Sequence, residues 1–151
     1  MVSPPVHHIR IRAFCYGTEI PDRVEAALRA VYPELGAPDE PAIEVTSSEG
    51  HYGHQIDIFS AELSNADQFR TVIDRIAAGG ELTQIARELD QRVTHDNELV
   101  IRFDKQTAYR EEVLTLGQGI EVSIKLEAYP AKRSAAIENI REYLDSLEDD
   151  S

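Results

Sequence analysis

The chain has 151 residues, of which 42% are hydrophobic, and this is enough for one domain with its own core. Cys15 is the single cysteine, which excludes an intramolecular disulfide and favours a reducing, intracellular setting. No apolar run approaches membrane-spanning length, and the first residues lack the basic start and apolar core of a secretion signal. We expect one cytoplasmic domain over residues 1–151, without a membrane partner and with flexible ends at 1–5 and 148–151.

The charge balance is strongly acidic. The chain carries 28 acidic and 15 basic side chains, a net charge of −13, which opposes simple attraction to a polyanion. Only three of the basic residues are lysines. A surface rich in carboxylates and poor in lysine resembles those of proteins from salt-accumulating archaea, and it predicts a halophilic source. In concentrated salt the Debye length shrinks to about 3 Å, so that contact geometry selects the partner more than net charge does.

The first part of the chain predicts a strand, a helix and a hairpin. Residues 6–16 alternate between apolar and other side chains, which is the period of a strand with one buried face. Apolar residues at three- and four-residue spacing after Pro21 predict an amphipathic helix that ends before Pro33. Alternation at 43–45 and 56–58 then predicts two strands joined by a glycine-flanked tip.

The second part predicts three helices and two strands. A cap at Ser64 or Asn65 begins a helix that the glycine at position 79 ends. The later elements are a helix, two strands and a final helix, expected at residues 82–93, 99–104 and 120–128 and from Pro130 onward.

The whole order is β-α-β-β-α-α-β-β-α. Strands that alternate this cleanly have one face on helices and one face in water. We therefore expect an α+β fold, a two-layer sandwich in which one antiparallel or mixed sheet of about five strands carries helices on one face. The pattern leaves the order of the strands open.

The open face of that sheet would mix arginines with aromatic rings. The period of two places on it Arg10, Arg12, Phe14, Tyr16, Arg102 and Lys125. Such a mixture suits a single-stranded nucleic acid, because rings stack on bases and guanidinium groups bind phosphates. Acidic residues are expected on the same face, at Glu44, Asp57, Asp104, Glu121 and Glu127. Cross-strand ion pairs would explain these charges without a ligand, and both interpretations stay open.

The hairpin tip at 48–54 presents two histidines and a tyrosine between glycines. Glycine permits the tight backbone of such a tip, and exposed rings there suit stacking on a base or contact with a partner. His51, Tyr52 and His54 are therefore candidate binding residues. A structural turn in which Tyr52 only covers the edge of the core is the alternative interpretation.

Two later segments combine cations with other binding groups. Residues 103–110 hold Lys105, Gln106, Tyr109 and Arg110 where a strand ends, and recognition groups gather at strand ends. In the segment 127–133, Lys132 and Arg133 stand at the expected start of the last helix, where free backbone N–H groups suit a phosphate. Glu127 could itself serve as that anion.

Catalytic and metal chemistry have weak signals. His51 and His54, with Glu49 and His95, are possible zinc ligands, but no thiolate accompanies them and no metal is predicted. A glycine-rich phosphate loop, a serine elbow and a His-Glu-x-x-His motif are all absent from the sequence. We therefore predict a protein that is not an enzyme and needs no cofactor.

Three phrases of the sequence carry a family resemblance: Ser-Glu-Gly-His-Tyr-Gly at 48–53, Asp-Lys-Gln-Thr-Ala-Tyr at 104–109 and Glu-Ala-Tyr-Pro-Ala-Lys-Arg at 127–133. With the opening at 6–12, they resemble an archaeal family of small RNA-binding proteins over nearly the whole chain. That family is described as a predicted exosome subunit, and its fold is similar to that of the ribosomal protein that binds 5S ribosomal RNA. The resemblance implies RNA as a partner, together with subunits of an RNA-processing complex. The net negative charge of this chain opposes simple electrostatic binding of RNA.

The leading hypothesis is a non-catalytic protein that binds structured or single-stranded RNA in RNA processing or exosome-mediated decay. It assigns base stacking to Tyr52 and Tyr109, hydrogen bonding to His51, His54 and Gln106, and phosphate binding to Arg10, Arg12, Lys105, Arg110, Lys132 and Arg133. It requires the tip and the segments around Lys105 and Lys132 to converge on one flank of the molecule. The alternative is an interaction module without RNA affinity, which would pair with another subunit or form a homodimer.

Overall fold

A computed structural model describes residues 3–49 and 55–149 of the chain. The elements in chain order are β1 (Val6–Tyr16), α1 (Pro21–Val31), β2 (Glu44–Glu49), β3 (Gln55–Leu63), α2 (Ala66–Ala78), α3 (Leu82–Arg87), α4 (Leu89–Arg92), β4 (Glu98–Asp104), α5 (Lys105–Glu111), β5 (Gly119–Leu126) and α6 (Arg133–Asp149). Among these described residues, no helix has the length and apolar character needed to cross a membrane.

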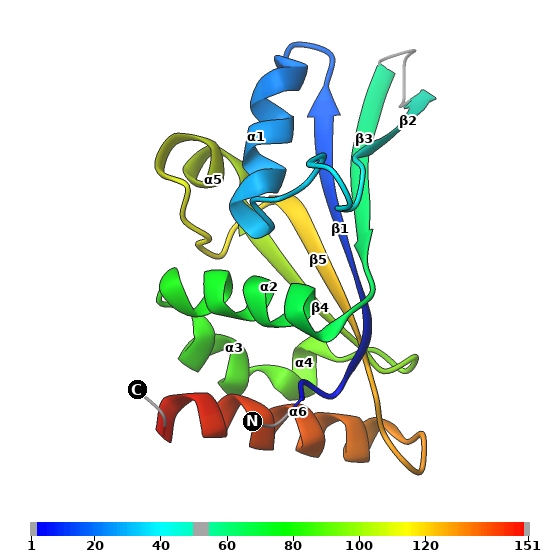
Figure 1. Ribbon diagram of the computed structural model, residues 1–151, viewed down its shortest axis with the longest axis vertical. Coiled ribbons are helices and arrows are strands. Elements are labelled where there is room, and N and C mark those ends of the chain that lie inside the picture. The colour runs from blue at the N-terminus through cyan, green and yellow to red at the C-terminus, as the bar shows by residue number, and fades with distance from the viewer. Residues whose placement is uncertain (1–2, 50–54, 150–151) are drawn as a thin grey trace.

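The strands form one open sheet in the order β2-β3-β1-β5-β4, and every neighbouring pair is antiparallel. The helices gather on one side of this sheet (Figure 1), with α1 and α2 packed against the central strand β1. The predicted α+β fold, with one sheet and helices on one face, is therefore confirmed. The predicted element order is also confirmed, except that α3 and α4 divide the third helix and α5 is an additional short one.

The core follows from the predicted apolar patterns. On β1, Ile9, Ile11 and Ala13 have no exposed surface, and they meet the apolar stripes of α1 and α2. Asn65 begins α2 with a capping box, because its side chain accepts a hydrogen bond from the N–H of Gln68 and the Gln68 side chain accepts one from Asn65. Burial of this one face leaves the opposite face of the sheet open.

The last third of the chain contains one helix that the sequence did not predict and one helix that begins later than predicted. Residues 105–111 form a helix, since the carboxylate of Asp104 accepts the N–H of Thr107 at 3.0 Å and caps it. The last helix begins at Arg133 instead of Pro130. The residues between run as a turn, in which the N–H of Lys132 donates to the Pro130 carbonyl at 2.7 Å.

The predicted face of Asp57 is also wrong. Asp57 lies opposite Cys15 in the ladder between β1 and β3, so it shares the helix-covered face with that buried cysteine. Its neighbours Ile56 and Ile58 take the open face, opposite Tyr16 and Phe14. Asp57 tolerates this face because it lies near the end of the sheet, where the Ser47 hydroxyl donates to it at 2.7 Å.

Candidate functional site

Ion pairs hold much of the charge on the open face. The guanidinium of Arg12 donates to the carboxylate of Glu121 on the neighbouring strand β5. Arg102 reaches the same carboxylate from β4 at 3.5 Å. The Arg12 guanidinium also lies 5.9 Å from the centroid of the Phe14 ring. The expected cross-strand ion pairs are therefore present, and they neutralise Arg12, one of the predicted phosphate ligands, together with Arg102.

Lys125 and Arg10 complete the cations of this face. The ammonium of Lys125 donates to the backbone carbonyl of Asp96. Arg10 is exposed, and it has no hydrogen-bond or ion-pair partner among residues 3–49 and 55–149. Only Arg10 among the three predicted arginines here thus keeps its guanidinium available within the described part of the chain.

Lys105 points into the molecule instead of toward solvent. Its side chain is 9% exposed, and its ammonium donates to Glu19 Oε1 at 2.7 Å and to the backbone carbonyl of Phe14. The same ammonium lies 5.1 Å from the centroid of the Tyr16 ring. Gly119 makes room for the lysine stem, because a Cβ at Gly119 would lie 2.6 Å from the Cβ of Lys105. Lys105 therefore ties α5 to the end of β1.

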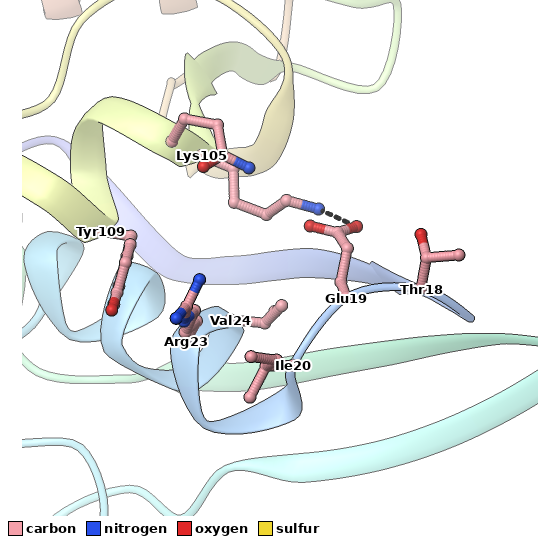
Figure 2. A pocket seen from close by; sticks show the side chains of 8 residues that line it. Thr18, Glu19, Ile20, Arg23, Val24, Lys105 and Tyr109 are labelled. Carbon is pink, nitrogen blue, oxygen red and sulfur yellow. Dashed lines mark hydrogen bonds and ion pairs between the residues drawn. The ribbon is translucent and has the colours of Figure 1, made fainter.

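A hollow of about 220 Å³ lies between the start of α1 and α5, beside this buried ion pair. Its lining residues are Thr18, Glu19, Ile20, Arg23, Val24, Lys105, Gln106 and Tyr109. Figure 2 shows Glu19 and Lys105 on one side of the hollow and Arg23 and Tyr109 across from them. The Arg23 guanidinium lies 5.3 Å from the centroid of the Tyr109 ring. A planar cation and a ring thus face a polar pair across a small cavity.

Gln106 and Arg110 stand one helical turn apart on α5, and both are exposed. Residues four apart on a helix lie on the same side of it. Arg110 therefore extends the rim of the hollow along α5. We call the four residues Arg23, Gln106, Tyr109 and Arg110 the α1–α5 surface.

The predicted convergence of three segments on one flank is wrong. Lys105 follows β4 and lies with Phe14 at the outgoing end of β1, whereas the segment with Lys132 follows β5. Because β4 and β5 are antiparallel neighbours, the segments that follow them leave from opposite ends of the sheet. The α6 end of the molecule accordingly lies far from α5 and from the start of α1 (Figure 1).

At that opposite end, Arg133 has a structural role. Its guanidinium donates to the backbone carbonyl of Val93 at 3.0 Å and to that of Asp90. Lys132 lies in the turn before α6, and its side chain is exposed. The structure therefore separates Lys132 and Arg133 from Gln106, Tyr109 and Arg110.

The tip residues His51, Tyr52 and His54 lie outside the described residues. The strand ends that flank the tip are placed, and Ile56 pairs with Tyr16 at the outgoing end of β1. In the part of the chain that the structure describes, no group of three His, Cys, Asp or Glu side chains is arranged to hold a metal ion. Cys15 is buried, and burial raises the pKa of its thiol, which keeps the thiol protonated and weakly reactive near neutral pH.

Sequence reasoning missed Glu19 and Ile20, which it assigned to no element, and Arg23, which fell within the predicted amphipathic helix. One signal was available. Arg23 stands in the first turn of a helix, where a cation opposes the helix dipole. The same reasoning was applied to Lys132 and would have selected Arg23 as well.

Comparisons with known proteins identify the family. A family model described as RNA binding matches residues 8–127. The chain belongs to this RNA-binding family. An RNA-binding protein of the archaeon Pyrococcus abyssi is 34% identical over 146 residues, which cover 92% of this chain and 94% of the relative.

Solved structures of archaeal proteins agree with the family assignment. A crystal structure from Archaeglobus fulgidus superposes with a TM-score of 0.78 at 30% identity, covering 91% of this chain and 98% of the other. A structure from Methanothermobacter thermautotrophicus gives a TM-score of 0.75 at 34% identity, covering 92% and 98%.

The region matched by the RNA-binding family also bears on the site. Residues 8–127 include every residue that lines the hollow, and they end before Lys132 and Arg133. Family membership therefore favours RNA over the alternative of an interaction module, and the matched region contains the α1–α5 surface.

Proposed function

We propose that this protein is a non-catalytic RNA-binding protein that contacts RNA through the α1–α5 surface. The guanidinium groups of Arg23 and Arg110 bind phosphates, Tyr109 stacks on a base, and Gln106 donates to base edges or ribose hydroxyls. Arg10 adds a phosphate contact from the open face. We also retain His51, Tyr52 and His54 as proposed RNA contacts, because the sequence of the tip favours this role.

The observation that carries the proposal is that Arg23 and Arg110 have no carboxylate or carbonyl partner among the described residues. Most arginines of the described chain are held by carboxylates or backbone carbonyls, as Arg12, Arg75 and Arg133 are. Among residues 3–49 and 55–149, Arg110 has no such partner and Arg23 contacts only the Tyr109 ring. Cations left unpaired beside an aromatic ring are the groups that bind single-stranded nucleic acid.

A pair of triple variants tests this location. Arg23→Ala, Tyr109→Ala, Arg110→Ala should lower the affinity for a mixed RNA pool by about a hundredfold, because it removes a stacking ring and two phosphate ligands. The matched control, Arg87→Ala, Tyr129→Ala, Lys132→Ala, removes the same charge and an exposed ring at the other end. Fluorescence anisotropy gives the affinities, and circular dichroism checks that both variants are folded.

The outcomes separate the interpretations. A larger loss in the control would place the interface at the Lys132 end. Equal affinities of parent and both variants would refute the α1–α5 surface as the contact. A parent that binds no RNA and forms a stable oligomer in light scattering would revive the interaction module.

Association with RNA processing is a second part of the proposal, and the family resemblance alone supports it. Co-sedimentation of the protein with a purified archaeal exosome core, with and without RNA, tests this association. Absence of co-sedimentation in both samples would restrict the proposal to RNA binding.

A further inference from the structure

The hollow has an apolar floor and two kinds of wall. Val24 is buried, and Ile20, which is 50% exposed, adds apolar surface at the mouth. Arg23 and Tyr109 form a planar wall, since the guanidinium lies over the ring. Glu19 and Lys105 form the polar wall. A flat, partly apolar molecule with a polar edge matches these walls.

The polar wall has unused hydrogen-bonding capacity. Glu19 Oε1 accepts from the Lys105 ammonium at 2.7 Å and from the backbone N–H of Tyr16 at 3.1 Å. Oε2 of Glu19 accepts no hydrogen bond from the described residues, and Figure 2 shows it on the side of the carboxylate that is nearer Tyr109. The ammonium has three N–H donors, two of which bind Glu19 and Phe14. One donor and one charged acceptor therefore stand side by side.

We propose that this hollow receives one unpaired guanine base of bound RNA, an inference that rests on the proposed RNA-binding function. The ring lies against the face of the Arg23 guanidinium, which Tyr109 supports from behind and whose edge N–H groups still bind a phosphate, and the base edge meets Lys105 and Glu19. Lys105 donates to the guanine O6, and the Glu19 carboxylate accepts from the guanine N1–H and N2–H. Gln106, at the rim, hydrogen-bonds the ribose or the adjoining base.

The edges of the four bases differ in how well they fit this wall. Guanine presents a carbonyl followed by two neighbouring N–H donors, which matches a cation beside a carboxylate. Uracil presents a single N–H between two carbonyls, so that one carbonyl would face the carboxylate and be repelled. Adenine and cytosine present an amino group beside a bare ring nitrogen, which gives the carboxylate one donor only. Guanine is therefore the preferred base.

The size and position of the hollow limit the RNA to a single strand. A base held in a duplex has its edge paired and its faces stacked, and it must leave the stack to enter a pocket. An unpaired base meets the least resistance to this movement. Arg110, one turn beyond Gln106, is then placed to bind the phosphate of the adjoining nucleotide.

The test uses four RNA octamers that differ at one central position, with guanine, adenine, cytosine or uracil in a uracil background. The full-length parent should bind the guanine octamer about tenfold more tightly than the uracil octamer in fluorescence anisotropy. Glu19→Gln should abolish this preference while the affinity for the uracil octamer stays within about twofold.

A second variant protects the test against misfolding, since Glu19→Gln leaves the buried Lys105 ammonium without its carboxylate. Thr18→Trp changes an exposed residue at the mouth and fills the hollow without touching that ion pair. It should bind all four octamers equally. Arg87→Ala on α3, which packs against α4 and α6, is the control and should keep the guanine preference.

The outcomes distinguish the guanine pocket from the RNA-binding function. Equal binding of the four octamers by the parent would overturn the guanine pocket and leave the RNA-binding proposal standing. A guanine preference that survives in Thr18→Trp would also overturn the pocket, because the base would then be recognised elsewhere. A parent that binds none of the octamers or longer RNAs would refute the proposed function itself.

Discussion

Asp104 and Lys105 are neighbours that fix the position of α5 by opposite means. Asp104 accepts hydrogen bonds from the N–H and the hydroxyl of Thr107 and so caps the helix. Lys105 extends back into the sheet and binds Glu19 and the Phe14 carbonyl. The placement of Gln106 and Tyr109 in the α1–α5 surface therefore depends on the two adjacent side chains of Asp104 and Lys105.

The cap at Asp104 gives a prediction at the residue scale. The hydrogen bonds from Thr107 hold the pKa of the Asp104 carboxyl below its usual range. A carboxyl whose pKa is lowered by folding contributes stability above its unfolded pKa, and this contribution disappears as pH falls through the folded pKa. Asp104→Ala should lower the free energy of unfolding by about 1 kcal/mol at pH 7. The difference from the parent should shrink below about pH 4.

Urea unfolding at pH 7 and pH 3 measures both effects of the Asp104 substitution. Asp104→Asn is the matched control, because asparagine caps a helix about as well as aspartate and does not titrate. Its stability should stay near that of the parent at pH 7. A loss in Asp104→Ala that is equally large at both pH values would contradict the role assigned to the ionised cap.

At the scale of the elements, periodicity predicted the long strands and helices and failed for short ones. The alternation of β1 and the stripes of α1 and α2 each extend over many residues, so that local patterns determine them. The helix α5 has seven residues and Ala108 as its one buried apolar side chain, which leaves no stripe to detect. Its existence depends on the cap at Asp104 and on the insertion of Lys105.

The candidate site was harder to predict than the fold for the same reason. Gln106, Tyr109 and Arg110 were selected as candidates from their residue types, because a ring, an amide and a cation follow a strand. The hollow exists only because α1 packs against α5, and no local pattern encodes that contact. Glu19 therefore entered the site through tertiary structure alone, and the one sequence signal for Arg23 was its place in the first turn of α1.

The start of β5 gives a prediction at the element scale. Gly119 has φ +111, and a Cβ there would lie 2.6 Å from the Cβ of Lys105. Gly119→Ala should therefore push Lys105 and α5 away from β1. We expect the free energy of unfolding to fall by about 2 to 4 kcal/mol, from backbone strain and overpacking together, and we expect RNA affinity to fall with it.

Gly80→Ala is a control that separates backbone strain from the steric clash with Lys105 expected in Gly119→Ala. Gly80 has φ +82 but no atom within 4 Å of an added Cβ, so alanine there brings strain alone. Its loss should be about 1 to 2 kcal/mol, with RNA affinity unchanged. Chemical unfolding and anisotropy on both variants check this. Equal losses of stability, or unchanged RNA affinity in Gly119→Ala, would show that the contact with Lys105 does not position α5.

At the scale of the whole molecule, antiparallel topology divides the predicted cations between two ends of the sheet. Most of the cations near the open face are held by ion pairs or by backbone carbonyls. The α1–α5 surface, with Arg10, therefore offers about three phosphate ligands on a protein of net charge −13. Long-range repulsion of RNA is screened as salt rises, which opposes the usual weakening of binding by salt.

The salt dependence of RNA binding should accordingly be shallow. Release of counterions from about three phosphates of a single strand gives a slope of about −2 for log K against log salt, and relief of the repulsion makes it shallower still. Arg23→Ala should reduce the slope by about 0.7, whereas Arg87→Ala at the other end should leave it unchanged. Anisotropy titrations between about 0.1 and 1 M salt measure all three slopes. A parent slope steeper than about −4 would require more phosphate contacts than this surface supplies, and RNA would then have to extend to the cations at the start of α6.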